Sequence, residues 1–289
     1  MHDSVLVAAH AKINLYLRVL AREESGYHGI ETIFQRIALH DDVRVSLSND
    51  RRLACAGPTM PAAGLGPVES NLAYRAALLY MDAARRDDGF SIDITKNIPV
   101  GGGLGGGSTD AAATLRAFDT LSTTPLGDAR LLELAAQLGS DVPFLLTGWS
   151  RALAWGRGTR MLELPALPTA AVTLVTFDEG VDTGSAYRAL AEQRLRDHAA
   201  VGAAALDASM LESWSGVAEL ATNDFESVVS QTHAGVKLAL HSLRSVAPAG
   251  AITMMSGSGA TCYVIDTDVE SLQIDPDFSG ARLVHTSTL

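Results

Sequence analysis

Residues 99–110, Pro-Val-Gly-Gly-Gly-Leu-Gly-Gly-Gly-Ser-Thr-Asp, contain six glycines among twelve residues. An ordered glycine costs backbone entropy and brings no side chain to a core, so such a run is typical of backbone that approaches a ligand closely. Ala111, Leu115 and Phe118 follow at helical spacing, which predicts a helix beginning near Ser108. A helix N-terminus presents unpaired N–H groups and roughly half a positive charge to an anion. We therefore expect a phosphate-binding loop.

Known phosphate-binding loops differ in what surrounds their glycines. Gly101-x-Gly103-x-x-Gly106 formally matches the dinucleotide-binding fingerprint, but Phe90–Thr95 alternates like a half-exposed strand, and a second helical pattern follows the first. No Lys-Ser or Lys-Thr pair follows the glycines, as a P-loop requires, and the chain has no His-Arg-Asp segment of the protein kinases. A flexible linker is disfavoured because a strand pattern precedes the run and a helical pattern follows it.

A second set of chemical groups lies on the alternating segment 11–19. Its apolar residues point to one side, and its polar residues point to the other side: Lys12, Asn14, Tyr16 and Arg18. That polar side is either a solvated sheet face, or Lys12 and Asn14 point into a cleft. The chain has only three lysines, and two of them, Lys12 and Lys96, flank the segments that we expect to bind ligand. This use of lysine favours a chemical role for both.

Other polar residues have a structural interpretation beside the chemical one. Asn71 and Asp141 precede helical patterns and could be N-caps, with Pro143 in the first turn after Asp141. Asp110 lies in a first helical turn next to the expected phosphate. It either caps the helix and points away from the phosphate, which we favour, or faces a phosphate-bound Mg²⁺.

The elements that position these residues follow from the spacing of apolar side chains. We expect a strand at 43–47, a helix from Ser70 to about Arg86, and a second region that opens with a strand at 172–175. Residues 51–69 are rich in Pro, Gly and Ala, which predicts a loop. One long helix is expected from 223–226 through Leu243, and a second glycine turn at 254–261 is expected between two strands.

The composition of the chain excludes some classes of binding partner and of cellular location. The formal net charge of −11 argues against nucleic acid or an anionic membrane as a general partner. The two cysteines give no disulfide framework. Because no stretch reaches the length of a membrane-spanning apolar segment and the start of the chain is not basic, we expect a soluble, cytoplasmic protein.

The pattern Pro-x-x-x-Gly-Leu-Gly-x-Gly-Ser, with Ala-Ala behind it, resembles the phosphate loop of the GHMP small-molecule kinases, such as the galactose, homoserine and mevalonate kinases. Further segments in the right order extend the resemblance from Ala11 to about Ala260, although His10 replaces the proline that usually precedes Ala-Lys. The resemblance implies an α+β fold of two domains, with an ATP-binding domain at 1–155 and a second domain at 156–289. It also implies an active site in the cleft between the two domains.

The resemblance implies specific residue roles. Lys12 and Asp141 are the implied catalytic residues: Asp141 as the base for the substrate hydroxyl, and Lys12 to offset developing negative charge. The implied ATP-binding residues are Asn71, Lys96, Pro99, Gly101, Gly102, Gly103, Leu104, Gly105, Gly106, Gly107, Ser108 and Thr109. The implied substrate-binding residues are Asn14, Tyr27, His28, Phe34, Thr183, Tyr187, Gly257, Ser258 and Gly259.

The implied reaction is ATP-dependent phosphorylation of a hydroxyl group, with Mg²⁺ accompanying the ATP. The family member that the loop most resembles acts on a cytidine diphosphate-linked polyol, and Tyr27, His28 and Tyr187 would hold the cytidine. Two alternatives stay open: a homoserine- or mevalonate-type kinase, which has no need for Tyr27 and His28, and a non-catalytic nucleotide-binding regulator on the same fold. The sequence indicates no protein ligand for the metal.

Overall fold

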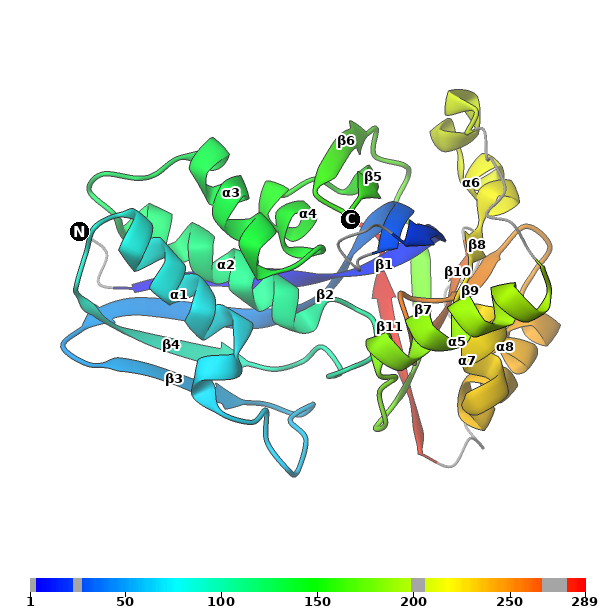
Figure 1. The fold of residues 1–289 in the computed structure, drawn as a ribbon, viewed down its shortest axis with the longest axis horizontal. Coiled ribbons are helices and arrows are strands. Elements are labelled where there is room, and N and C mark those ends of the chain that lie inside the picture. Colours follow the sequence, from blue (N-terminus) through cyan, green and yellow to red (C-terminus); the bar gives the residue numbers. More distant parts are fainter. Residues whose placement is uncertain (1–3, 23–27, 199–205, 267–279) are drawn as a thin grey trace. The chain divides into compact units, whose positions relative to one another are not determined.

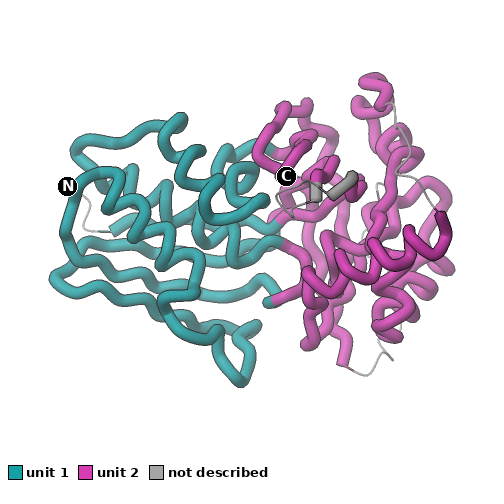
Figure 2. The backbone as a smooth tube through the Cα atoms, viewed as in Figure 1, with its two compact units in different colours: residues 1–11, 39–100, 105–149 teal, residues 12–38, 101–104, 150–289 magenta. Residues whose placement is uncertain are grey.

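A computed structural model of the protein describes residues 4–22, 28–198, 206–266 and 280–289 (Figure 1). The chain forms two compact units, each built from three segments (Figure 2). Unit 1 comprises residues 1–11, 39–100 and 105–149, and unit 2 comprises residues 12–38, 101–104 and 150–289. The long strands β1 (Ser4–Arg22) and β2 (His28–Ser48) each contribute residues to both units. The expected domain division at residues 155 and 156 stays a prediction.

In unit 1, helices cover a small sheet. The end of β2 pairs antiparallel with β4 (Gly89–Thr95), from Asp42 opposite Thr95 to Ser48 opposite Gly89. Phe90 of β4 packs edge-on against Phe118, with the ring centroids 5.6 Å apart. Helices α1 and α2 lie against each other beside these strands (Figure 1). The helices of the unit are η1 (Val68–Ser70), α1 (Leu72–Ala83), α2 (Gly106–Leu121), α3 (Asp128–Leu138) and α4 (Val142–Thr147).

In unit 2, the first half of β2 pairs antiparallel with β5 (Arg151–Gly156), which pairs with β6 (Arg160–Leu164). The short strand β8 (Thr222–Asn223) runs parallel to β1. A separate antiparallel sheet has the order β11 (Ala281–Ser287), β7 (Ala171–Phe177), β10 (Cys262–Asp266), β9 (Ile252–Met255). The helices are α5 (Thr183–Arg196), η2 (Ala208–Glu212), α6 (Trp214–Leu220), α7 (Glu226–Thr232) and α8 (Ala234–Val246). The expected α+β class is confirmed.

The expected loop at 51–69 is wrong at its start. Residues Arg51–Ala56 form strand β3, which pairs parallel with β4 from Arg51 opposite Phe90 to Ala56 opposite Thr95. Side chains of β3 alternate between exposed and half-buried along its second half. The Pro-, Gly- and Ala-rich composition of the whole stretch hid this short edge strand.

The expected long helix is also wrong, because it is two helices. His233 separates α7 from α8 with an extended backbone, φ −123° and ψ 93°. Val229 and Val236, on either side of the break, are buried in the same hydrophobic cluster. Apolar spacing therefore continues through the break and cannot reveal it. A Cβ on Gly235 would lie 2.9 Å from Cε1 of Phe177, so the first turn of α8 lies close against β7.

Candidate active site

The glycine-rich loop alternates its backbone conformation on the way into α2. Gly101, Gly103 and Gly105 have φ values of 75°, 78° and 75°, which L-amino acids with a side chain rarely adopt. Gly105 is the N-cap residue of α2, so the helix begins at Gly106, two residues before the expected start. Gly103 requires glycine for a second reason besides its φ value: a Cβ there would overlap the carbonyl oxygen of Ser256.

Within unit 2, residues 101–104 of the loop lie against the second glycine turn. Ser256 Oγ donates a hydrogen bond to Gly103 O over 2.9 Å, and Thr261 N donates to Gly102 O over 3.1 Å. A Cβ on Gly257 would lie 3.2 Å from Gly103 O. The second glycine turn between β9 and β10 is therefore confirmed, and it lies against the first loop.

Lys12 also lies beside residues 101–104 of the glycine-rich loop. Its side chain is 3 % exposed, and Nζ donates to Asn14 Oδ1 over 2.8 Å and to Gly103 O over 2.9 Å. Its ammonium also lies 5.7 Å from the centre of the Phe34 ring. The solvated-face interpretation of β1 is thus wrong: Lys12 and Asn14 are buried beside the loop.

Phe34 itself is fully buried beneath Lys12. Its expected stacking on cytidine stays a prediction, and in this structure the ring has no exposed face.

Thr183 and Ser258, two of the expected substrate residues, are also brought together. Their hydroxyl oxygens are 2.8 Å apart, which joins the start of α5 to the second glycine turn. Tyr187, one turn further along α5, packs edge-to-face with Phe225, and the ring centroids are 4.9 Å apart. His28 is the first residue of β2, and Tyr27 lies outside the described residues.

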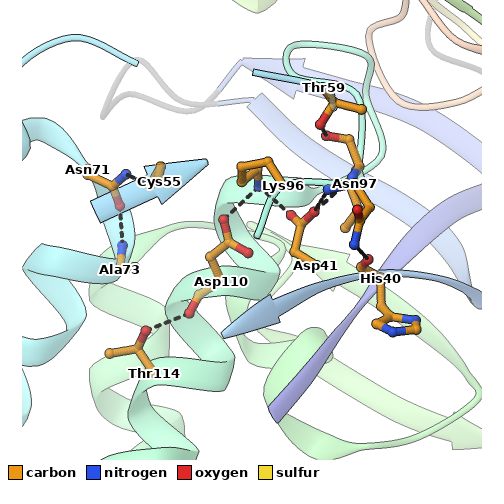
Figure 3. A network of polar contacts seen from close by, with 11 residues as sticks. His40, Asp41, Cys55, Thr59, Asn71, Ala73, Lys96, Asn97, Asp110 and Thr114 are labelled. Carbon is orange, nitrogen blue, oxygen red and sulfur yellow. Dashed lines mark hydrogen bonds and ion pairs between the residues drawn. The ribbon is translucent and has the colours of Figure 1, made fainter. Parts of the chain in front are cut away.

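Lys96 has partners that the sequence did not reveal. It is 2 % exposed, and its ammonium forms ion pairs with Asp41 and, over 2.7 Å, with Asp110 Oδ2 (Figure 3). Asp41 Oδ1 also accepts from the backbone N–H groups of Asn97 and Ile98 over 2.5 Å and 2.8 Å. Asp41 therefore fixes the segment that leads from β4 to the glycine-rich loop. The ATP-binding role of Lys96 stays a prediction.

The favoured expectation for Asp110, a capping role, is wrong, because α2 has no side-chain cap and Asp110 pairs with Lys96; a position beside Mg²⁺ stays a prediction. Its carboxylate is 4 % exposed and committed to Lys96, while its Oδ1 has no hydrogen-bond partner in the structure. Burial raises the pKa of Asp110 to about 7, against the opposing effect of the Lys96 ammonium. Although burial alone would lower it, the two carboxylates raise the pKa of Lys96. The cluster thus holds one buried cation between two carboxyl groups.

This cluster predicts a pH dependence of stability. Because the Asp110 carboxyl loses its proton at a higher pH when folded than when unfolded, the folded state binds more protons between about pH 4 and 7. The contribution of Asp110 to the free energy of unfolding therefore falls as pH rises through that window and is fully lost above it. Asp110→Asn removes this ionisation. Between pH 5 and pH 7.5 the free energy of unfolding of the variant should therefore fall less than that of the wild type, by on the order of 2 kcal/mol.

Urea unfolding of both proteins at the two pH values measures this difference. Asp82→Asn, at an exposed position of α1, is the matched control and should keep the wild-type pH dependence. An Asp110→Asn protein with the wild-type pH dependence would show that this carboxyl does not titrate in the window.

Two expected N-caps have different outcomes. Asn71 is the N-cap of α1, and its side-chain oxygen accepts from Ala73 N over 2.9 Å. Its capping role is confirmed, and its place beside a nucleotide stays a prediction. Asp141 occupies the N-cap position of α4, but its side chain makes no capping hydrogen bond. The capping interpretation of this carboxylate is therefore wrong.

The remaining expected loop residues surround the start of α2. Thr109 is 2 % exposed and Leu104 is 1 % exposed, whereas Gly107 is exposed and Ser108 and Pro99 are half-buried. In the first turn of α2, Gly107 is therefore the solvent-exposed residue, and the adjacent Ser108 is half-buried. Lys12 N donates to Leu104 O over 3.0 Å, which ties β1 to the loop in unit 2.

The described residues offer no protein cage for Mg²⁺. Within them, no three His, Cys, Asp or Glu side chains come together in a way that could hold a metal ion. Mg²⁺ commonly takes one or two protein oxygens and completes its shell with substrate phosphates and water. Asp110, in the helix that follows the loop, is already engaged by Lys96. The residues present therefore fit a metal that arrives with the nucleotide, and no residue is assigned to it.

The chain is similar to known proteins both in the segment that contains the glycine-rich loop and over most of its length. Residues 71–148, which contain the loop, match the family model described as "GHMP kinases N terminal domain". Over 263 residues the chain is 38 % identical to a 4-diphosphocytidyl-2-C-methyl-D-erythritol kinase of Solibacter usitatus, covering 90 % of this chain and 80 % of that protein. A protein of the same name from Leifsonia xyli is 35 % identical over 97 % of this chain and 94 % of its own length.

The chain belongs to the 4-diphosphocytidyl-2-C-methyl-D-erythritol kinase family, within the GHMP kinases. A crystal structure of 4-(cytidine 5'-diphospho)-2C-methyl-D-erythritol kinase superposes with a TM-score of 0.75 at 32 % identity, covering 98 % of this chain and 99 % of the other. A homoserine kinase from Cytophaga hutchinsonii, 16 % identical with a TM-score of 0.67, shares the fold; it covers 100 % of this chain and 95 % of its own. The family resemblance read from the loop is confirmed.

The structure can also be searched for membrane-spanning helices. Among the residues that it describes, no helix combines the length and the apolar character needed to cross a bilayer.

Proposed function

We propose that this chain transfers a phosphoryl group from ATP to the 2-hydroxyl of 4-diphosphocytidyl-2-C-methyl-D-erythritol, a step of non-mevalonate isoprenoid synthesis. Relatives that carry this kinase name over nearly the whole chain support the proposal. The single observation that carries it is the position of Lys12, whose buried ammonium lies 2.9 Å from the carbonyl oxygen of Gly103 in the glycine-rich loop. A cytoplasmic location and the absence of nucleic-acid partners stay predictions.

In this proposal, the loop and the first turn of α2 bind the ATP phosphates. The exposed Gly107 and the half-buried Ser108 offer backbone N–H groups at the positive end of the helix dipole. Asn71, at the start of α1, lies beside the nucleotide. Mg²⁺ would arrive with ATP and neutralise charge on its phosphates, which is the chemistry that it supplies when bound.

Lys12 and Asp141 have separate parts in the chemical step. Phosphoryl transfer proceeds through a loose transition state, so positioning and electrostatic stabilisation dominate over strong base catalysis. Lys12 binds the acceptor hydroxyl and offsets the negative charge that develops near it. Asp141 accepts the hydroxyl proton. Its side chain makes no capping hydrogen bond to α4.

The cytidine group would be held by stacking and by hydrogen bonds to the base edge. Tyr187, which packs edge-to-face with Phe225, supplies the stacking ring, while His28 and Tyr27 supply polar contacts. Thr183 and Ser258 share a hydrogen bond and present two hydroxyl groups for the diphosphate. A pyrimidine without charge suits such an aromatic and polar pocket.

A coupled ADP-release assay over a panel of acceptors tests the proposal. The panel contains 4-diphosphocytidyl-2-C-methyl-D-erythritol, homoserine, mevalonate and galactose, each with Mg²⁺ and ATP. We expect turnover with the first compound and background rates with the others. Turnover with homoserine or mevalonate would assign the chain to another kinase of this fold, and no turnover with any acceptor despite ATP binding would favour a nucleotide-binding regulator.

A loop variant tests the phosphate site without disturbing the fold. Gly103 is unsuitable, because a side chain there would collide with Ser256. At Gly107 a Cβ would lie 3.8 Å from Leu72 Cδ1, an ordinary contact. Gly107→Val therefore places a side chain where phosphate approaches and should weaken ATP binding by about tenfold or more, with Gly107→Ala in between.

Calorimetric titration with ATP measures this effect. Ala129→Val makes the same kind of change at an exposed site in the first turn of α3 and should bind ATP like the wild type. A Gly107→Val protein that binds ATP as tightly as the wild type would place the phosphates elsewhere.

A further inference from the structure

Thr32 of β2 is a buried residue for which the sequence suggested no role. It is 0 % exposed, and its hydroxyl donates to the backbone carbonyl of Tyr16 over 2.7 Å. The same oxygen accepts a hydrogen bond from Asn14 Nδ2 over 2.8 Å. Asn14 Oδ1 in turn accepts from Lys12 Nζ over 2.8 Å. Thr32 is therefore connected to the Lys12 ammonium through one amide group.

The direction of this hydrogen-bond chain is fixed at both of its ends. A backbone carbonyl can only accept, so the Thr32 proton goes to Tyr16 O and the Thr32 oxygen is left to accept from Asn14. An ammonium group can only donate, so Lys12 requires an oxygen of Asn14. Both ends select the same orientation of the Asn14 amide, with its NH₂ toward Thr32 and its oxygen toward Lys12.

The backbone of Asn14 is held independently. Tyr263, which is 0 % exposed, donates its hydroxyl to Asn14 O over 2.7 Å. With the backbone fixed, the remaining freedom at Asn14 is the rotation of its side-chain amide. Removing the Thr32 hydroxyl would leave the Asn14 NH₂ group buried without its acceptor, so the amide would no longer be held at this position and would shift together with the Lys12 ammonium bound to it.

We propose that Thr32 is a positioning residue for phosphoryl transfer: through the Asn14 amide it sets the location of the Lys12 ammonium beside the glycine-rich loop. The proposal rests on the proposed function only for the role of Lys12 in the reaction. The geometric part concerns Thr32, Asn14 and Lys12 alone. The Asn14 amide oxygen is neutral, so this contact orients the ammonium without itself neutralising the charge.

The test uses Thr32→Val, which removes the hydroxyl and keeps the volume, and Thr32→Ser, which restores the hydroxyl. Because the chain has only three lysines, protein labelled with ¹⁵N in its lysine side chains gives signals from Lys12, Lys96 and Lys237 alone. Lys12→Met and Lys237→Met assign them. In Thr32→Val the Lys12 signal should shift, while the signal of Lys237, which is exposed on α8, stays in place.

The kinetic result should follow the spectroscopic one. We expect kcat of Thr32→Val to fall roughly 10- to 100-fold, the effect of one unsatisfied buried polar group acting on a transition state, with KM for ATP nearly unchanged. Thr32→Ser should recover most of kcat and the wild-type Lys12 signal. A residue that only stabilised the fold would move neither the Lys12 signal nor the balance between kcat and KM.

Thr176→Val is the matched control. Thr176 is 3 % exposed in β7, and its hydroxyl also donates to a backbone carbonyl, that of Arg282, over 3.3 Å. Its loss should change thermal stability only. Should Thr32→Val not fold, Thr32→Cys keeps the volume with a much weaker acceptor and enters the same measurements.

Two results would overturn the proposal: a Lys12 signal in Thr32→Val identical to that of the wild type, or a Thr32→Ser protein that behaves like Thr32→Val. Failure of the proposed function looks different, because the wild type would then show no turnover with 4-diphosphocytidyl-2-C-methyl-D-erythritol. In that case the lysine signals still decide whether Thr32 positions Lys12.

Discussion

Asp141→Asn is expected to lower kcat by about 10²- to 10⁴-fold, the usual cost of removing a general base. The amide has nearly the same shape as the carboxylate but cannot accept the hydroxyl proton. Because asparagine is nearly isosteric with aspartate and keeps a side-chain oxygen, the thermal midpoint of the variant should stay close to that of the wild type. Steady-state kinetics with the diphosphocytidyl substrate, together with calorimetric ATP binding, check both parts.

The control for this variant is Asp128→Asn. Asp128 lies in the first turn of α3 and pairs with Arg116, and its side chain is 76 % exposed. It should keep wild-type kcat. Near-normal kcat in Asp141→Asn would exclude Asp141 as the base, whereas a parallel loss of folding would make the kinetic result structural.

Lys12→Met should lower kcat by about 10²- to 10³-fold, which is the range for removing one preorganised group that stabilises transition-state charge. Methionine is close in length to lysine and is apolar, so it fits a site that is 3 % exposed and lies against the Phe34 ring. ATP affinity should change less than kcat. Lys12→Arg is not expected to restore the rate, because a planar guanidinium cannot take the place of a compact ammonium between Asn14 Oδ1 and Gly103 O.

Lys237→Met removes an equal charge from the exposed side of α8 and should leave kcat and stability unchanged. If Lys12 and Asp141 act on one hydroxyl, the double variant Lys12→Met with Asp141→Asn will lose much less than the product of the two single losses. Multiplicative losses would indicate that the two residues act in separate steps. A Lys12→Met enzyme with normal kcat would remove Lys12 from the mechanism.

Local patterns in the sequence predicted the glycine-rich loop, the helix behind it and the side of β1 that carries Lys12 and Asn14. These features depend on residue types and spacings within a few positions of one another. The burial of that polar side could not be predicted from alternation alone, because residues that lie against it, such as Tyr263, 249 positions from Asn14, are distant in the sequence.

The partners of Lys96 and Asn14 were missed for the same reason. Asp41 is 55 positions from Lys96, and Thr32 is 18 positions from Asn14. No periodicity links such residues, and an aspartate or threonine in a strand has no local signature for an ion pair or a buried hydrogen bond. The capping interpretation of Asp141 failed differently: the residue type and the following Pro143 both fit an N-cap, but the side chain does not make the bond.

The different exposure of the three lysines has a practical consequence. Lys12 and Lys96 are 3 % and 2 % exposed, whereas Lys237 is exposed on α8. Acylating dyes and activated resins attack unprotonated amines and leave the guanidinium groups of arginine untouched, because those remain protonated in proteins. Lysine-directed acylation of the folded protein should therefore be confined to Lys237 among the lysine side chains. A fluorophore or a solid support can then be attached at one defined side chain of unit 2 without touching Lys12.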